Sequence, residues 1–169
     1  PFKVLDDEKM DTLVDSIRKN GILNPVIVRP DQSGNYEMIS GHRRLHAARI
    51  VGLKKIPAIV KEMSDDEAII KMVDANIQRE EILPSEKAFA YKMKLDALKR
   101  TAGRPTKENA CHNGTHLRSD QELALQVGDS ARSIQRYVRL TELVPELLDY
   151  VDNKKIGLVM AVDLSYLDE

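Results

Sequence analysis

The spacing of apolar residues over the first sixty positions predicts two helices and three short strands. From residue 10 to residue 17 apolar side chains recur every three or four positions, which is typical of one buried helix face, and Asn20-Gly21 offers a helix stop. Short apolar runs bounded by Pro and Gly predict the strands. The expected elements are helices over residues 6–20 and 43–52 and strands over residues 25–28, 36–39 and 56–60.

From residue 64 onward the pattern predicts helices alone. Ser64 and Glu67 have the spacing of a capping box, which would start a helix that runs through residue 73. Ser119 and Ser130 are the expected N-caps of two later helices. The remaining expected helices cover residues 84–100, 121–127, 131–143 and 145–156.

The segment over residues 101–118 interrupts this pattern. It is rich in Gly, Pro and Asn and poor in apolar residues, which indicates a linker or a mobile insertion. We therefore expect an α+β fold: a small mixed α/β domain over residues 1–80, then an all-helical domain over residues 81–169.

Composition narrows the class of protein. Apolar residues make up 42% of the 169 positions and charged residues 31%, so the chain can form a folded core. No apolar run is long enough to span a membrane, and a single cysteine suits a reducing compartment, so we expect a soluble, cytoplasmic protein without a membrane partner. The net charge of -1 argues against a uniformly basic surface, yet residues 99–118 contain five basic residues and one acidic residue.

Three small or apolar residues point to a helix-turn-helix over residues 119–143. Ala124 would let the two helices approach, Gly128 would permit the tight turn and Ile134 would fill the seam. The second helix of such a unit enters the major groove of DNA. The alternative is a plain helical hairpin with arginines on a solvated face. The candidate DNA-binding residues are Ser130, Arg132, Ser133, Gln135, Arg136 and Arg139.

The sequence Gly41-His42-Arg43-Arg44 is a candidate phosphate site. It lies where a strand is expected to lead into a helix, and the backbone N–H groups at a helix start attract anions. Two guanidiniums can each bind phosphate through two hydrogen bonds. The alternative is a helix start whose arginines pair with acidic neighbours. A second segment, Asn76-Ile77-Gln78-Arg79, offers an amide and a guanidinium that could close over the same ligand.

Three segments occur in an order and spacing that resemble ParB-type (ParB/Noc-like) partition proteins: residues 21–29, 41–48 and 76–79. The resemblance implies a ParB/sulfiredoxin-like N-terminal domain that binds CTP with Mg, and a helix-turn-helix that recognises a centromere-like site on double-stranded DNA. It also implies a ParA-type ATPase partner, a homodimer of the full-length protein, and association with the nucleoid or a plasmid. The insertion favours a mobile-element or plasmid subclass.

The resemblance assigns roles residue by residue. Gly41, Arg43 and Arg44 would hold the triphosphate, with His42 in the same segment. Asn76 would lie near phosphate or Mg, and Arg79 would complete the pocket. The segment bordering the base would include Gly21, Asn24 and Pro25.

Two positions depart from the family pattern, because His42 and Ala75 stand where the family usually has Glu. Both carboxylates are associated with metal handling and hydrolysis, so we expect at most weak CTPase activity. Binding without turnover, or a different nucleotide, stays open.

Other functions fit the sequence less well. A sulfiredoxin-like enzyme would need a cysteine beside the glycine segment, and a two-metal nuclease would need clustered carboxylates. A nucleotide-dependent kinase of the same fold, a helix-turn-helix transcription regulator without nucleotide control, and a protein-interaction adaptor remain alternatives. Cys111, His112 and His116 lack the paired spacing of a zinc site.

Overall fold

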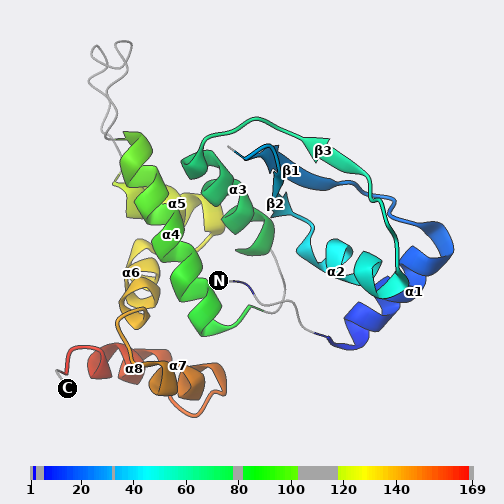
Figure 1. Cartoon of the computed structure of the whole chain (residues 1–169). Helices are drawn as coiled ribbons and strands as arrows, with labels where there is room; N and C mark the ends of the chain where they lie inside the picture. Colours follow the sequence, from blue (N-terminus) through cyan, green and yellow to red (C-terminus); the bar gives the residue numbers. More distant parts are fainter. Residues whose placement is uncertain (1, 3–5, 32, 78–81, 103–117, 168–169) are drawn as a thin grey trace, which may run out of the picture. The chain divides into compact units, whose positions relative to one another are not determined.

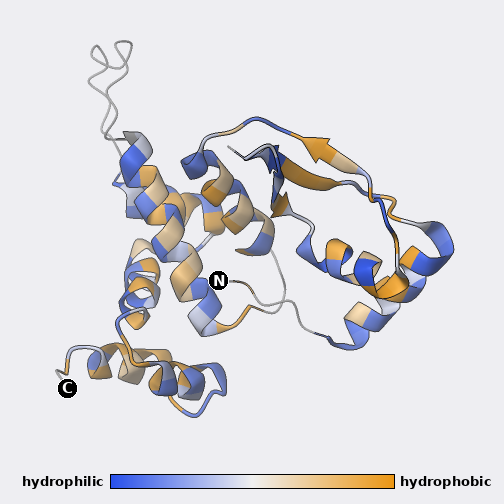
Figure 2. Cartoon of the chain, in the orientation of Figure 1, coloured by the Kyte–Doolittle hydropathy of each residue, from blue (hydrophilic) through white to orange (hydrophobic). Residues whose placement is uncertain are grey.

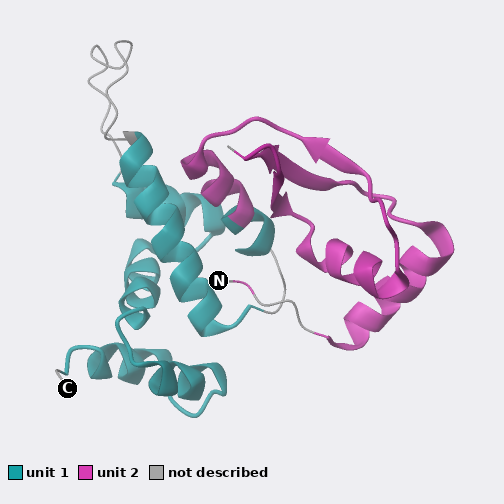
Figure 3. Ribbon diagram, viewed as in Figure 1, with its two compact units in different colours: residues 1, 73–169 teal, residues 2–72 magenta. Residues whose placement is uncertain are grey.

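The computed structural model describes residues 2, 6–31, 33–77, 82–102 and 118–167 (Figure 1). Its contacts divide the chain into two units, one over residues 2–72 and one from residue 73 onward (Figure 3). The expected α+β fold is confirmed: one unit contains the only sheet among the described residues, and the described part of the other is helical. The domain boundary expected after residue 80 lies outside the described residues and stays a prediction.

The first unit combines two whole helices and the start of a third with a three-stranded sheet. Its elements are α1 (Glu8–Asn20), β1 (Val26–Pro30), β2 (Tyr36–Ser40), α2 (His42–Val51), β3 (Ala58–Val60) and the start of α3 (Asp65–Ile77). The strand order is β2-β1-β3, with β2 antiparallel and β3 parallel to β1. Figure 2 shows β1 and β3 as largely hydrophobic strands.

Helix α1 packs on α2 through the apolar face that the sequence predicted. Met10, Val14 and Ile17 are buried against Ala47 of α2. The helix begins where the Asp7 carboxylate accepts a hydrogen bond from the Met10 N–H at 2.7 Å. This packing fixes the place of α2 and therefore of the candidate phosphate site at its start.

The capping box of α3 is confirmed. The Ser64 N–H donates to Glu67 Oε2 at 2.8 Å, and the Glu67 N–H donates to Ser64 Oγ at 3.3 Å. The hydrogen bond from the Ser64 N–H, and after it the one from the Ser64 hydroxyl, lower the pKa of the Glu67 carboxyl below its ordinary value.

The second unit is built around one long helix, α4 (Pro84–Ala102). The other helices are α5 (Ser119–Val127), α6 (Ala131–Leu140), α7 (Pro145–Asp152) and α8 (Leu158–Leu164). One buried cluster joins α4 to α5 and α6, and a second joins α4 to the segment from α6 to α8. The first cluster consists of Tyr91, Leu95, Leu123 and Ile134.

Three details of the helical half were predicted wrongly. Ser119 is the first residue of α5 and not its cap, because Arg118 occupies the N-cap position and its N–H donates to the Gln121 side chain at 3.2 Å. Helix α6 ends at Leu140, since a turn replaces its expected last residues. Helix α8 was not expected at all. Among the described residues, no helix has the length and apolar character needed to cross a bilayer.

Candidate phosphate-binding and nucleic-acid sites

Gly41 joins β2 to α2 in a conformation that only glycine adopts easily. Its φ is 108°, and an added Cβ would lie 2.6 Å from Val26 Cγ1 on β1. The first helical hydrogen bond of α2 runs from the Leu45 N–H to the Gly41 carbonyl at 3.0 Å. The backbone N–H groups of residues 42–44 lie in the first turn, before the hydrogen-bond ladder of the helix begins, as at every helix start. The turn therefore brings backbone donors and a helix N-terminus close to the sheet, which suits an anion.

Arg44 links this turn to the segment before β1. Its Nη1 donates to the carbonyl oxygens of Asn24 at 2.5 Å and Pro25 at 2.7 Å. The structure thus brings together Asn24, Pro25 and Arg44, three of the residues assigned to the nucleotide site. Gly21 ends α1 with a φ of 68° and leads into this segment.

Arg43 has an acidic partner within the first unit. Its Nη2 lies 2.8 Å from Asp7 Oδ1, the same oxygen that caps α1. The neighbouring His46 makes a similar contact with Asp6 at 2.8 Å. The alternative interpretation of this site, an arginine paired with an acidic neighbour, therefore describes Arg43 in this structure but does not describe Arg44.

The second candidate segment lies mostly outside the described residues. Asn76 is buried, with 5% of its surface exposed, and belongs to the part of α3 that groups with the second unit. Arg79 lies outside the described residues. In the same part of α3, Asp74 pairs with the ammonium of Lys94, which is buried on α4. The end of α3 is therefore anchored to α4, and the assigned roles of Asn76 and Arg79 stay predictions.

Helices α5 and α6 pack as the helix-turn-helix pattern predicts. Gly128 has a φ of 74° and ends α5, and its N–H donates to the Ala124 carbonyl at 3.0 Å. Ile134 is fully buried beside Leu123, and Ala124 packs against the same cluster. The three residues thus have the steric places assigned to them.

A polar network holds the turn between these helices to α4. Asp129 accepts a hydrogen bond from the Tyr91 hydroxyl at 2.5 Å and pairs with the Lys87 ammonium at 2.8 Å. The same ammonium lies 4.8 Å from the ring of Tyr137 on α6. Burial alone would raise the pKa of the Asp129 carboxyl, but the hydrogen bonds from Lys87 and Tyr91 outweigh burial and lower the pKa below its ordinary value.

Two of the predicted DNA-binding arginines are available for a ligand. Within the described ranges, the side chains of Arg132 and Arg136 make no hydrogen bond or ion pair with the protein, and Arg132 is exposed. Ser130 caps α6, since its hydroxyl accepts the Ser133 N–H at 3.0 Å. Ser130 and Arg132 lie at the start of α6, where a recognition helix contacts bases and phosphates, and Arg136 lies one turn further on.

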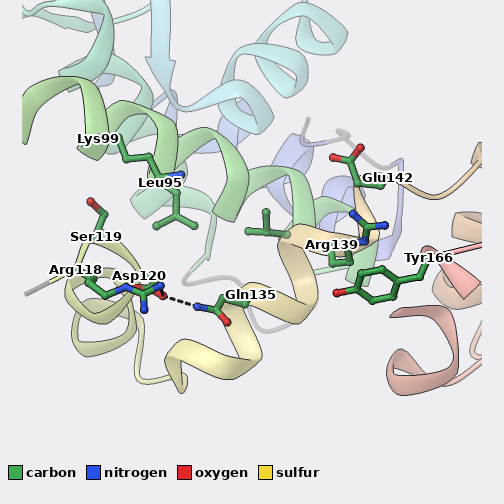
Figure 4. A pocket seen from close by; sticks show the side chains of 10 residues that line it. Leu95, Lys99, Arg118, Ser119, Asp120, Gln135, Arg139, Glu142 and Tyr166 are labelled. Atoms are coloured by element: carbon green, nitrogen blue, oxygen red, sulfur yellow. Dashed lines mark hydrogen bonds and ion pairs between the residues drawn. The ribbon is translucent and has the colours of Figure 1, made fainter. Parts of the chain in front are cut away.

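The other two long side chains of the predicted set have hydrogen-bond partners within the unit. Arg139 Nε donates to Ser165 Oγ at 2.9 Å, a further N–H donates to the Ser165 carbonyl, and the guanidinium lies 4.1 Å from the Tyr166 ring centre. Gln135 donates to the Asp120 carboxylate at 2.6 Å. Both lie beside a pocket of about 630 Å³ between α4, α5 and α6 (Figure 4).

The polar residues that line this pocket include some that were not among the predicted site residues, such as Lys99, Arg118 and Asp120. Lys99 and Arg118 belong to the basic stretch over residues 99–118, so the local charge of the sequence could have indicated them as site residues. No local sequence pattern indicated Asp120, because its contact with Gln135 joins positions 15 residues apart.

An α/β unit followed by a helix-turn-helix defines the class of this protein, and comparison with known proteins gives the family. Residues 1–77 match the model described as the ParB N-terminal domain. This part of the chain therefore belongs to the ParB N-terminal domain family, and the resemblance inferred from the sequence is confirmed.

Relatives match both halves of the chain. Chromosome-partitioning protein Spo0J from Thermus thermophilus is 33% identical over 156 residues, which are 92% of this chain and 51% of that protein. A nucleoid occlusion protein from Listeria innocua is 34% identical over 157 residues, 93% of this chain and 49% of that protein. The chain spans about half the length of the curated relatives it matches.

A solved structure supports the fold. The C-terminally truncated ParB from Caulobacter crescentus, complexed to the centromeric parS site, aligns with a TM-score of 0.59 and 24% identity, over 100% of this chain and 79% of that one. This likeness supports the α+β fold along the whole chain.

Proposed function

We propose that this chain recognises a centromere-like site on double-stranded DNA through α5 and α6, as part of a DNA partition system. The observation that carries the proposal is the state of α6, where Arg132 and Arg136 have no partner among the described residues while Ile134 anchors the helix in the core. The names of the relatives, a chromosome-partitioning protein and a nucleoid occlusion protein, support the same function.

The second part of the proposal is that a nucleoside triphosphate, CTP by family resemblance, binds at the start of α2 and switches DNA binding. Support comes from the glycine turn, where a Cβ would collide with Val26, and from the N–H groups that follow it. Gly41, His42, Arg43 and Arg44 would contact the phosphates, with Asn76 and Arg79 as further contacts. Bound Mg would neutralise phosphate charge through the phosphate oxygens, with Asn76 as its candidate protein ligand.

The wider assignments follow from the family. They are a ParA-type ATPase partner, a homodimer of the full-length protein, and association with the nucleoid or a plasmid. We expect at most weak hydrolysis of CTP, because His42 and Ala75 replace the usual carboxylates. A second candidate function is a transcription regulator without nucleotide control. The pairing of Arg43 with Asp7 favours it, since that guanidinium already has an anionic partner.

DNA binding is tested with the double variant Arg132→Ala, Arg136→Ala. A preferred duplex is first selected from a random pool, and affinity is then measured by fluorescence anisotropy at several salt concentrations. We expect at least about a tenfold loss of affinity and a shallower dependence on salt, because phosphate contacts release counterions. Arg18→Ala, which removes an exposed guanidinium from α1, is the control. Unchanged binding of every duplex by the double variant would refute the assignment to α6.

Nucleotide binding is tested by calorimetry with each nucleoside triphosphate and Mg. We expect Arg43→Ala and Arg44→Ala each to abolish CTP binding, while Arg49→Ala, at the far end of α2, retains it. Circular dichroism checks the fold, and Arg44→Lys keeps the charge without the planar fork. Equal CTP affinity in the wild type and the two alanine variants would refute the assignment of the triphosphate to this site.

A further inference from the structure

Asp120 is held rigidly near the start of α5. Its side chain is only 11% exposed, and both carboxylate oxygens accept hydrogen bonds. Oδ1 accepts the Gln121 N–H at 3.0 Å, and Oδ2 accepts Gln135 Nε2 at 2.6 Å and Arg118 Nη2 at 3.1 Å. Figure 4 shows the Gln135 side chain pointing from α6 to this carboxylate. Asp120 therefore has a fixed place from which it can orient Gln135.

The chemistry of a carboxylate decides which way the Gln135 amide faces. A carboxylate only accepts hydrogen bonds, whereas an amide has an NH₂ donor on one side and a carbonyl acceptor on the other. The NH₂ group of Gln135 must therefore face Asp120. One N–H and the carbonyl oxygen remain for another molecule.

Gln135 belongs to the exposed face of α6. It follows the exposed Arg132 by three positions, a spacing that places two residues on one helix face. Its side chain is exposed despite the contact with Asp120. In a helix-turn-helix this face of the second helix meets the edges of the base pairs.

We infer that Asp120 is a positioning residue that sets the base preference of Gln135, an inference that rests on the proposed DNA binding by α6. With its NH₂ turned to Asp120, the amide presents a carbonyl oxygen beside its second N–H. Adenine offers the matching pair in the major groove, the N6 amino donor beside the N7 acceptor. Guanine has the O6 acceptor in place of the amino group, so the oriented amide selects adenine over guanine at one position of the site.

The variant Asp120→Asn tests this orientation, because it keeps the shape of the side chain and removes one of its two acceptors. If the Asn oxygen stays on the Gln121 N–H, its own NH₂ faces Gln135, and the glutamine amide turns over. We expect the preference for adenine over guanine to fall by about tenfold at one position and to stay unchanged at the others. Glu122→Gln is the matched control: it removes the same charge from an exposed position of the same helix.

The measurement uses the selected duplex and all its single base-pair variants, with affinities from fluorescence anisotropy. The variant Gln135→Ala, at an exposed residue, identifies the base pair that Gln135 contacts, since the preference for adenine must disappear at that base pair. Equal discrimination in the wild type and Asp120→Asn at that position overturns the inference while DNA binding stands. A loss shared with Glu122→Gln, or no adenine preference that depends on Gln135, also overturns it. Failure of the wild type to bind any duplex would instead refute DNA binding by α6, and the inference with it.

Discussion

Helix α2 in the first unit and helix α6 in the second both carry arginines to which the sequence assigned a ligand, a triphosphate at α2 and DNA at α6. Their surroundings differ. At α2, Arg43 pairs with Asp7, and Arg44 donates to the carbonyl oxygens of Asn24 and Pro25. At α6, Arg132 and Arg136 have no such partner in the part of the chain that the structure describes.

The difference lies in which residues hold each helix in place. Helix α6 is positioned by Ile134 in the core and by Asp129 in the turn, so Arg132 and Arg136 take no part in holding it. Helix α2 packs on α1 through Ala47, and the candidate phosphate ligands Arg43 and Arg44 themselves make further contacts to neighbouring segments. A ligand at α6 therefore meets prepared side chains, whereas a triphosphate at α2 must compete with partners inside the protein, and this exchange reduces its affinity.

The largest effect expected in either region is that of Gly41→Ala. A residue with a side chain at a φ of 108° is strained, and the new Cβ would lie 2.6 Å from Val26 Cγ1. Strain and overpacking together cost about 3 kcal/mol. We expect this loss in the free energy of unfolding, measured by urea denaturation followed by circular dichroism.

Gly52→Ala separates the two causes. Gly52 has a φ of 85°, but nothing lies within 4 Å of its added Cβ, so only strain of about 1 kcal/mol applies. Equal losses in the two variants would mean that the close approach of Gly41 to β1 adds nothing, and the turn would not be specific for glycine on packing grounds.

The next effect separates two arginines of α6. Arg139→Ala removes the hydrogen bonds to Ser165 and the stacking on Tyr166, so we expect the free energy of unfolding to fall by about 2 kcal/mol. Arg132→Ala should leave stability unchanged and weaken DNA binding. Urea denaturation and anisotropy measure both quantities on both variants. An Arg139→Ala protein with wild-type stability and weakened DNA binding would show that Arg139 contacts DNA and not Ser165.

A smaller effect depends on pH. The pKa of Asp129 is lowered in the folded protein, so its ionised form stabilises the fold at neutral pH, and this contribution disappears as pH falls through the lowered value. We expect Asp129→Asn to cost about 1 to 2 kcal/mol at pH 7 and less at pH 3. Asp149→Asn, at an exposed position of α7, should cost nothing at either pH. A cost for Asp129→Asn that does not change with pH would contradict the charged network.

The elements that the sequence predicted correctly depend on neighbours in sequence. The capping box of Ser64 and Glu67 joins positions three apart, and the seam residue Ile134 is set by a short helix-turn-helix spacing. Such signals are local and can be read without knowing the fold. Helix α8 lacked such a local signal, because it has only seven residues and no side-chain cap.

The partners of the candidate site residues could not be predicted for the opposite reason. Arg43 meets Asp7 across 36 positions, and Arg139 meets Ser165 across 26. Many acids and hydroxyls stand at comparable separations, and only the packing of α1 on α2, or of α8 on α6, selects one. The sequence therefore located the arginines but not their partners within the protein.

The smallest effect tests the comparison between the two regions directly, through Asp7→Asn. Asparagine still caps α1, because its side-chain oxygen can accept the Met10 N–H, but it no longer pairs with Arg43 through a charge. A partly exposed ion pair is worth up to about 1 kcal/mol, so its removal should raise CTP affinity by roughly fivefold in calorimetry. Asp15→Asn removes the same charge from the exposed side of α1, where Asp15 pairs with Arg18, and should leave affinity unchanged. A fall in CTP affinity for Asp7→Asn would mean that Asp7 positions Arg43 for the ligand instead of competing with the ligand. The arginines of both regions would then be positioned before their ligands bind.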